Sequence, residues 1–169
     1  MQLLKPAHEE ASCNRFLNIY NKQSGNKVVL VRLGNPTADE PDCVCSNGVA
    51  IELVGIYDNN YQAEKMWSTA RDKSILQQPN IQLLTLDNLV SEIGKKLYKL
   101  EAGNYNGFSG KIILVCNLYS PLLQDHEVIQ FANSYAPFRS DGFFEAYFDE
   151  IWVSWKSDRD GAWKTRRLE

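Results

Sequence analysis

Glu52 is the residue of this 169-residue chain whose surroundings point most strongly to chemistry. It lies in the segment 49–56, VAIELVGI, in which every neighbour of the acid is apolar. A strand that is apolar on both faces is expected to be central and covered on both sides, where a carboxylate must be paired, protonated or bound to a metal. The two interpretations are an ion pair with a nearby Lys or Arg and a carboxylate of a functional site.

A second acid, Asp42, lies on the predicted strand before Glu52, and the connection between the two strands decides whether the acids meet. A two-residue turn at 47–48 would set Asp42 opposite Leu53, on the face away from Glu52. A three-residue loop with Gly48 in the left-handed conformation would set Asp42 directly opposite Glu52, with their Cβ atoms roughly 5 Å apart. Both registers are compatible with the sequence.

In the second register, Asp42 and Glu52 would repel each other unless a cation lay between them. Carboxylate oxygens without a thiolate or an imidazole beside them favour Mg²⁺ or Mn²⁺ over zinc. The pair of acids therefore predicts a site for Mg²⁺ (or Mn²⁺).

The residues around these acids resemble the PD-(D/E)XK motif of the restriction-endonuclease-like nucleases. Residues 41–42 are Pro-Asp, and residues 51–54 are Ile-Glu-Leu-Val. The resemblance implies that Asp42 and Glu52 bind the metal and that Leu53 offers its backbone carbonyl to the same ion. It also implies a core of one helix, three strands, a helix and a strand.

The motif lysine is missing, because Val54 stands where the family has the Lys that assists the attacking water. Some members of the superfamily resemble this pattern and supply the Lys from a neighbouring helix. Lys96 is the preferred candidate, since at about 100° per residue it falls at the edge of the apolar stripe of a predicted helix at 86–100. Lys65, in a preceding predicted helix at 59–72, is an alternative.

The predicted first helix, 4–21, offers two further acids. Glu9 continues the apolar stripe of that helix, and Glu10 lies beside it. The resemblance implies that an acid of the first helix serves as an outer metal ligand, whereas the alternative is an acid favoured by the helix dipole. The candidate catalytic residues are therefore Glu52, Asp42, Lys96, Glu9 and Glu10.

Periodicity and turn signals predict the other elements that position these residues. Strands are predicted at 27–33, 42–46, 81–86, 112–116, 150–155 and 162–168, and a further helix at 125–134. This order predicts an α/β fold with a mixed β-sheet flanked by helices. It matches a restriction-endonuclease-like αβββαβ core over about residues 7–118 of a single domain, 1–169, with a C-terminal β-hairpin extension over about 119–169.

Charge and composition bear on the partners. The formal net charge of −3 argues against tight DNA binding by the chain as a whole but leaves room for a local basic patch. Lys164, Arg166 and Arg167 interleave with tryptophans near the C-terminus and are candidate phosphate contacts, the alternative being a solvated hairpin over core tryptophans. The four cysteines lack the spacing of a zinc or redox motif and are expected to be buried apolar residues.

The chain has no apolar run of bilayer-spanning length, and its N-terminus lacks the apolar region of a signal peptide. We therefore expect a cytoplasmic protein without a membrane partner. The sequence does not fix the oligomeric state, and a homodimer is one option.

Three functional hypotheses follow from these residues. The leading one is a metal-dependent nuclease that hydrolyses phosphodiester bonds in DNA, with DNA favoured over RNA as the partner. The second is a catalytically inactive nuclease-fold module that binds nucleic acid or protein, which the missing lysine and the acidic net charge favour. The third is an unrelated α/β protein with a buried Glu ion pair.

Overall fold

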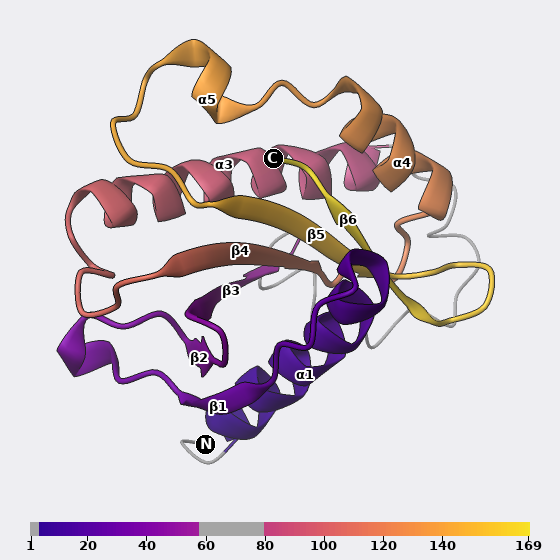
Figure 1. Ribbon diagram of the computed structural model, residues 1–169. Helices are drawn as coiled ribbons and strands as arrows, with labels where there is room; N and C mark the ends of the chain where they lie inside the picture. The colour runs from indigo at the N-terminus through magenta and orange to yellow at the C-terminus, as the bar shows by residue number, and fades with distance from the viewer. Residues whose placement is uncertain (1–3, 58–79) are drawn as a thin grey trace.

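The computed structural model describes residues 4–57 and 80–169, which form an α/β fold around one six-stranded mixed sheet (Figure 1). The helices are α1 (Leu4–Ser24), α3 (Asn80–Glu101), α4 (Asp125–Ser134) and α5 (Phe138–Asp141), with a short 3-10 helix at Pro36–Ala38. The strands are β1 (Leu30–Leu33), β2 (Cys43–Cys45), β3 (Val49–Ile56), β4 (Lys111–Leu118), β5 (Glu150–Lys156) and β6 (Trp163–Arg167). The predicted mixed sheet flanked by helices is confirmed.

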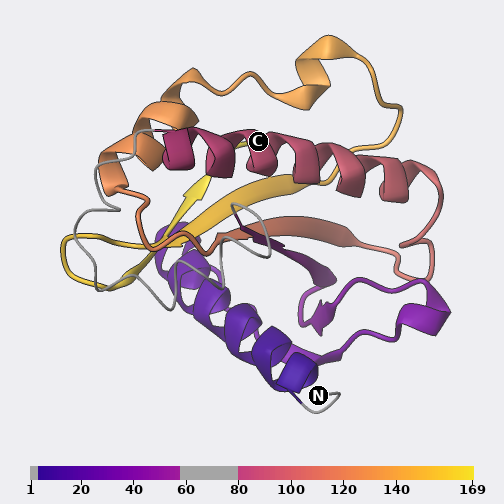
Figure 2. The ribbon, with the colours of Figure 1, turned by 180° about the vertical axis from the view of Figure 1, so that it is seen from behind.

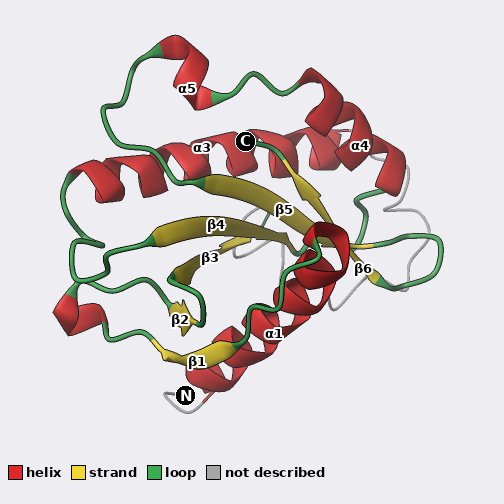
Figure 3. Cartoon of the chain, in the orientation of Figure 1, coloured by secondary structure: helices red, strands yellow, loops and turns green. Residues whose placement is uncertain are grey.

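The strands lie across the sheet in the order of the chain. β2 pairs antiparallel with both β1 and β3. β3, β4 and β5 run parallel, and β6 returns antiparallel to β5. Parallel neighbours require a crossover, which contains α3 between β3 and β4, and α4 and α5 between β4 and β5 (Figure 3). The C-terminal hairpin is confirmed, and because β5 pairs with β4 it continues the central sheet.

Helices cover both faces of the sheet, and the core has two corresponding parts (Figure 2). On one face, α1 packs Phe16 and Tyr20 among other buried side chains. On the other face, α3 packs Leu89, Ile93 and Leu97, all fully buried. β3 and β4 therefore lie between two helices, which explains why the sequence of β3 is apolar on both sides.

The sequence predicts a helix at 59–72 and a strand at 81–86, and the structure describes only the second of these segments. Residues 81–86, predicted as a strand, belong to α3, which is continuous from Asn80 to Glu101. Their leucines continue the helical spacing of the residues that follow, and a short apolar run cannot by itself distinguish a strand from a buried helix. The predicted helix at 59–72, which contains Lys65, lies outside the described residues.

The β2–β3 hairpin takes the register that brings the two acids together. Cys43 pairs with Ile51, and residues 47 and 48 both have left-handed φ angles, of 60° and 68°. Continuing the pairing by one residue sets Asp42 opposite Glu52. Of the two predicted registers, the one with a left-handed Gly48 is therefore confirmed.

β2 ends early and leaves one edge of β3 open. β2 pairs with β3 only as far as Ile51, whereas β3 continues beside β4 to Ile56. The chain before Asp42 is Pro41, which has no N–H with which to continue the ladder. Beyond Ile51, β3 therefore has no ladder partner from β2, and the Leu53 N–H donates to the Asp42 side chain instead.

The cysteines occupy the core rather than a surface site. All four are buried and free, which confirms their assignment as buried apolar residues. Cys13 of α1 and Cys45 of β2 lie closest, with 4.0 Å between their sulfur atoms. Within residues 4–57 and 80–169, no helix combines the length and the apolar character needed to cross a membrane.

Candidate functional site

Two hydrogen bonds hold Asp42 to β3 where β2 ends, one to Glu52 and one to Leu53. The backbone N–H of Leu53 donates to Asp42 Oδ2 at 2.8 Å, and the backbone N–H of Asp42 donates to Glu52 Oε2 at 3.1 Å. These bonds replace the next rungs of the β2–β3 ladder, so the two N–H groups are paired although the strand has ended. The predicted proximity of the two acids is confirmed.

Lys96 of α3 reaches over the sheet to Glu52. Its Nζ lies 2.5 Å from Glu52 Oε1, and the Tyr105 hydroxyl donates to the same oxygen at 2.9 Å. The Lys96 and Glu52 side chains are only 14% and 7% exposed. Burial and the charge of Glu52 raise the pKa of Tyr105, so the phenol remains a donor. This geometry fits both interpretations of Glu52, an ion pair and a site carboxylate.

Negative charge accumulates around Asp42. Burial of this side chain, and then the charge of Glu52, raises the pKa of Asp42 from 3.8 to about 6. The Leu53 N–H and Lys96 oppose this rise, and Glu9 adds to it. A carboxylate in these surroundings is stabilised in its charged form by an additional cation.

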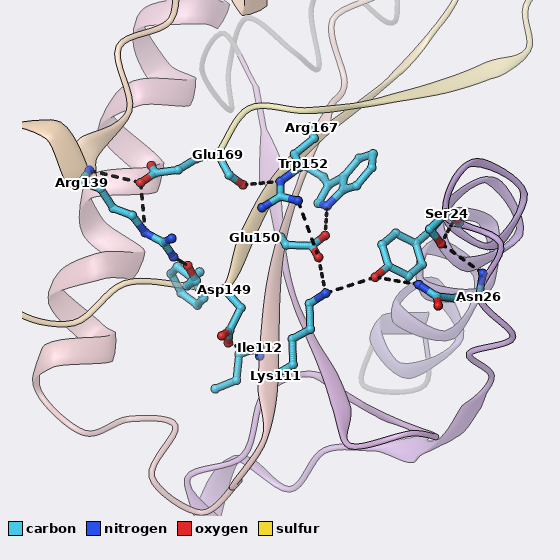
Figure 4. A network of polar contacts seen from close by, with 12 residues as sticks. Ser24, Asn26, Lys111, Ile112, Arg139, Asp149, Glu150, Trp152, Arg167 and Glu169 are labelled. Atoms are coloured by element: carbon cyan, nitrogen blue, oxygen red, sulfur yellow. Dashed lines mark hydrogen bonds and ion pairs between the residues drawn. The ribbon is translucent and has the colours of Figure 1, made fainter.

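A second buried acid shows how this fold compensates a carboxylate at another place in the sheet (Figure 4). Glu150, at the start of β5, forms an ion pair with Lys111 and accepts a hydrogen bond from the Trp152 indole at 2.6 Å. Arg167 lies 3.9 Å from the same carboxylate. Two cations thus face one acid there, whereas among residues 4–57 and 80–169 only Lys96 forms an ion pair with the two acids at the end of β2. The excess of negative charge distinguishes the Asp42–Glu52 pair.

A pocket of about 230 Å³, here called the acid pocket, opens between the first turns of α1 and the ends of β3 and β4. Asp42 and Leu53 line it together with Glu9. The Glu9 side chain is 18% exposed and lies 3.4 Å from the ammonium group of the exposed Lys5. Glu10 is exposed and does not line this pocket. Of the two acids predicted from the first helix, the structure therefore brings only Glu9 to the pair.

The donors at the acid pocket fit a hard divalent cation that keeps part of its water. Mg²⁺ is usually bound through one or two carboxylates, with water and substrate phosphates as its other ligands. Asp42 and Glu9 supply carboxylates, and the Leu53 carbonyl faces the same side of β3 as the N–H that donates to Asp42.

Glu52 has less capacity for a metal than the sequence predicts. Glu52 does not line the acid pocket, and from residues 4–57 and 80–169 it accepts three hydrogen bonds, of about four that a carboxylate can accept, so roughly one lone pair is left. Within residues 4–57 and 80–169, no three His, Cys, Asp or Glu side chains form a ready metal-binding group. An ion at this place would therefore take several of its ligands from water and substrate.

The predicted phosphate contacts near the C-terminus lie elsewhere. Lys164, Arg166 and Arg167 line a groove of about 570 Å³ that shares no lining residue with the acid pocket. Lys164 Nζ lies 2.8 Å from the buried Asp125 carboxylate, and Arg166 donates to the Asn133 side chain at 2.6 Å. Arg167 donates to the backbone of the last residue at 3.2 Å. These charges are partly engaged within the fold, and their contact with nucleic acid stays a prediction.

Sequence reasoning missed two side chains of the site. Tyr105 lies between α3 and β4 in a segment without periodicity, so nothing in its spacing indicates a bond to Glu52. Ser12, only 2% exposed, lines the acid pocket, and its hydroxyl has no hydrogen-bond partner within the described part of the chain. Its position three residues after Glu9 could have indicated it, because i and i+3 share a helix face.

Comparisons with known proteins do not identify the chain. Neither the protein-family models nor the curated proteins nor the solved structures gave a match. Its function is therefore inferred from the geometry and charge of the site.

Proposed function

We propose that this protein is a divalent-metal-dependent nuclease that hydrolyses phosphodiester bonds in DNA. The observation that carries the proposal is the contact of Lys96 with Glu52, beside Asp42, where β2 ends. The strand position of the motif lysine is taken by Val54, and a helix lysine that reaches the same carboxylate supplies the missing charge. The order α1–β1–β2–β3–α3–β4 supports the restriction-endonuclease-like core expected over residues 7–118.

The roles of the side chains follow from their contacts. Asp42, Leu53 through its carbonyl, and Glu9 line the acid pocket and would hold Mg²⁺ or Mn²⁺, whereas Glu52, which does not line it, would position Asp42 and Lys96. When bound, such an ion lowers the pKa of a coordinated water and stabilises the charge that builds on the phosphate. Lys96 carries its positive charge next to this place and would neutralise a phosphate oxygen or orient the attacking water. Tyr105 would hold the Glu52 carboxylate in position.

A second candidate function is a module of the same fold that binds without cutting. The observation that favours it is that the Glu52 carboxylate already accepts hydrogen bonds from Lys96, Tyr105 and the Asp42 N–H. In that case Lys96 and Glu52 form a structural ion pair. Binding of DNA without cleavage would then be observed.

The test is incubation of the purified protein with circular single-stranded DNA and with supercoiled plasmid, in Mg²⁺ or Mn²⁺ and in EDTA. Metal-dependent cleavage of either substrate that disappears in Asp42→Asn would support the proposal, because asparagine removes the charge and can still accept from the Leu53 N–H. Lys96→Met should abolish cleavage as well.

The matched control is Lys95→Met. Lys95 comes directly before Lys96 on α3. Its side chain is 66% exposed, and it pairs with Glu92 at 2.6 Å. This variant should cut at the wild-type rate. Absence of cleavage of both substrates by the wild-type protein, in both metals, would contradict the nuclease proposal and leave the binding module.

A further inference from the structure

Aromatic rings line the same pocket as the acids. Tyr57 and Tyr119 stack with their ring centroids 5.2 Å apart and their planes 20° from parallel, and both line the acid pocket. The Tyr119 hydroxyl lies 3.0 Å from His8 Nε2. Gly55 makes room for the stack, since a Cβ there would lie 3.0 Å from the Tyr57 ring and 3.3 Å from the Tyr119 ring. The acid pocket therefore has an aromatic wall as well as an acidic one.

Polar atoms without partners lie beside this wall. The Ser12 hydroxyl lines the acid pocket and has no hydrogen-bond partner among residues 4–57 and 80–169, although Ser12 is 98% buried. Arg15 donates to Asn117, another pocket residue, at 3.3 Å, while its Nε is buried and without a partner in the same ranges. Buried polar groups are almost always paired. The Ser12 hydroxyl therefore indicates a polar ligand in the acid pocket, which Arg15 itself does not line.

The aromatic wall continues into a second pocket. Tyr119 also lines a neighbouring pocket of about 230 Å³, together with Lys156 and Trp163. The Tyr119 and Trp163 rings meet edge to face, with centroids 6.0 Å apart, and the Arg15 guanidinium lies 3.6 Å over the Trp163 ring. Aromatic faces beside cations are the means by which proteins hold unpaired nucleic-acid strands.

We propose that the substrate is single-stranded DNA, held with one unpaired base against Tyr119 and the adjoining phosphate toward Asp42. This inference rests on the proposed function for the bond that is cut. A base reaches a tyrosine in a pocket only after it has left the stack of a duplex. Tyr119 lines both pockets, so the acid pocket takes the phosphate beside one base and the second pocket takes the next base along the strand. Ser12 then hydrogen-bonds to the sugar or the phosphate.

The experiment measures binding in Ca²⁺ in place of Mg²⁺ or Mn²⁺, because this oxygen-preferring cation offsets the charge of the acids toward the phosphate, and electrophoresis of the probe checks that no strand is cut. Fluorescence anisotropy compares a labelled oligothymidylate with a labelled duplex of the same length. The wild-type protein should bind the single strand at least about tenfold more tightly than the duplex. Tyr119→Ala should weaken single-strand binding by about tenfold to a hundredfold, the range seen when one stacking ring is lost, whereas Tyr119→Phe should bind like the wild type.

Thermal melting of each variant separates lost binding from lost folding. Phe143→Ala is the matched control, because Phe143 is an aromatic side chain that is 70% exposed and lines neither pocket. It should leave binding unchanged. Equal or tighter binding of the duplex, or a Tyr119→Ala protein that melts normally and binds the single strand as the wild type does, would overturn the inference.

Failure of the nuclease proposal has a different signature. In that case no DNA is cut in Mn²⁺, whatever its form, while the preference for single strands in Ca²⁺ persists. Cleavage of duplex DNA without cleavage of single strands would instead overturn the substrate class and leave the nuclease in place.

Discussion

Replacing Asp42 by asparagine should stabilise the metal-free protein at neutral pH. Burial and the charge of Glu52 raise the folded-state pKa of Asp42 to about 6, from 3.8. Between pH 3.8 and about 6, an acid whose pKa is raised in this way binds more protons in the folded state than in the unfolded state. The stability of the wild-type protein that depends on Asp42 therefore falls as the pH rises through this window. Asparagine has no charge to acquire and can still accept the Leu53 N–H.

The magnitude follows from the two pKa values of Asp42. A rise of roughly two pKa units, at about 1.4 kcal/mol each, gives up to about 3 kcal/mol of unfolding free energy above the folded-state pKa, and nearly zero below 3.8. For a chain of this length, that difference corresponds to a melting temperature higher by roughly 6–12 °C.

The assay is urea denaturation of the wild-type and Asp42→Asn proteins in EDTA, at a series of pH values from about 4 to 8. Only the difference between the two proteins at each pH is used, because other acids change stability in the opposite direction. Glu40, whose pKa is lowered to about 2 mainly by Arg32, contributes stability that is lost as the pH falls. A variant that is no more stable than the wild type at any pH would refute the reasoning.

Three further predictions concern the residues around the pair. Lys96→Met leaves the nearly buried Glu52 carboxylate without its cation and should lower the unfolding free energy by up to about 3–5 kcal/mol. The exposed Lys95→Met should lower it by less than about 1 kcal/mol, and equal losses in urea denaturation would contradict the buried pair. Glu9→Gln should weaken Mn²⁺ binding by about tenfold or more in calorimetry, and Glu10→Gln should not; the reverse order would exclude Glu9 as an outer ligand. Gly55→Ala should displace the stack of Tyr57 and Tyr119, which would change the near-ultraviolet circular dichroism and weaken single-strand binding. The affinity for Mn²⁺ should stay the same, and an unchanged spectrum would count against the stack.

The central hairpin shows how far sequence reasoning reaches. β3 could be predicted to the residue, because a continuous apolar run ends at a turn signal on one side and at polar residues on the other. Its register with Asp42 could not, because Asn47-Gly48 predicts a turn without fixing the pairing. The apolar residues decide it in the folded chain, since a slip by one residue would turn Cys43 and Cys45 away from the core under α1.

Contacts between distant segments account for what was missed. Lys96 could be proposed from its angle on the helix, but its partner depended on how α3 lies over the sheet. Tyr105 carries no periodic signal, and Lys164 gave no indication of the buried Asp125 that it contacts. Each of these bonds joins residues that lie far apart in the sequence, so no local pattern indicates it.

The most direct test of the account is a calorimetric titration of Mn²⁺ into the metal-free wild-type and Asp42→Asn proteins. The account predicts a single bound ion per wild-type chain and loss of that binding in Asp42→Asn, because the charge of Asp42 is the excess that the cation offsets. Wild-type protein that binds no Mn²⁺, or an Asp42→Asn protein that binds it equally well, would contradict the account and leave Glu52 and Lys96 as an ion pair that only holds the sheet to α3.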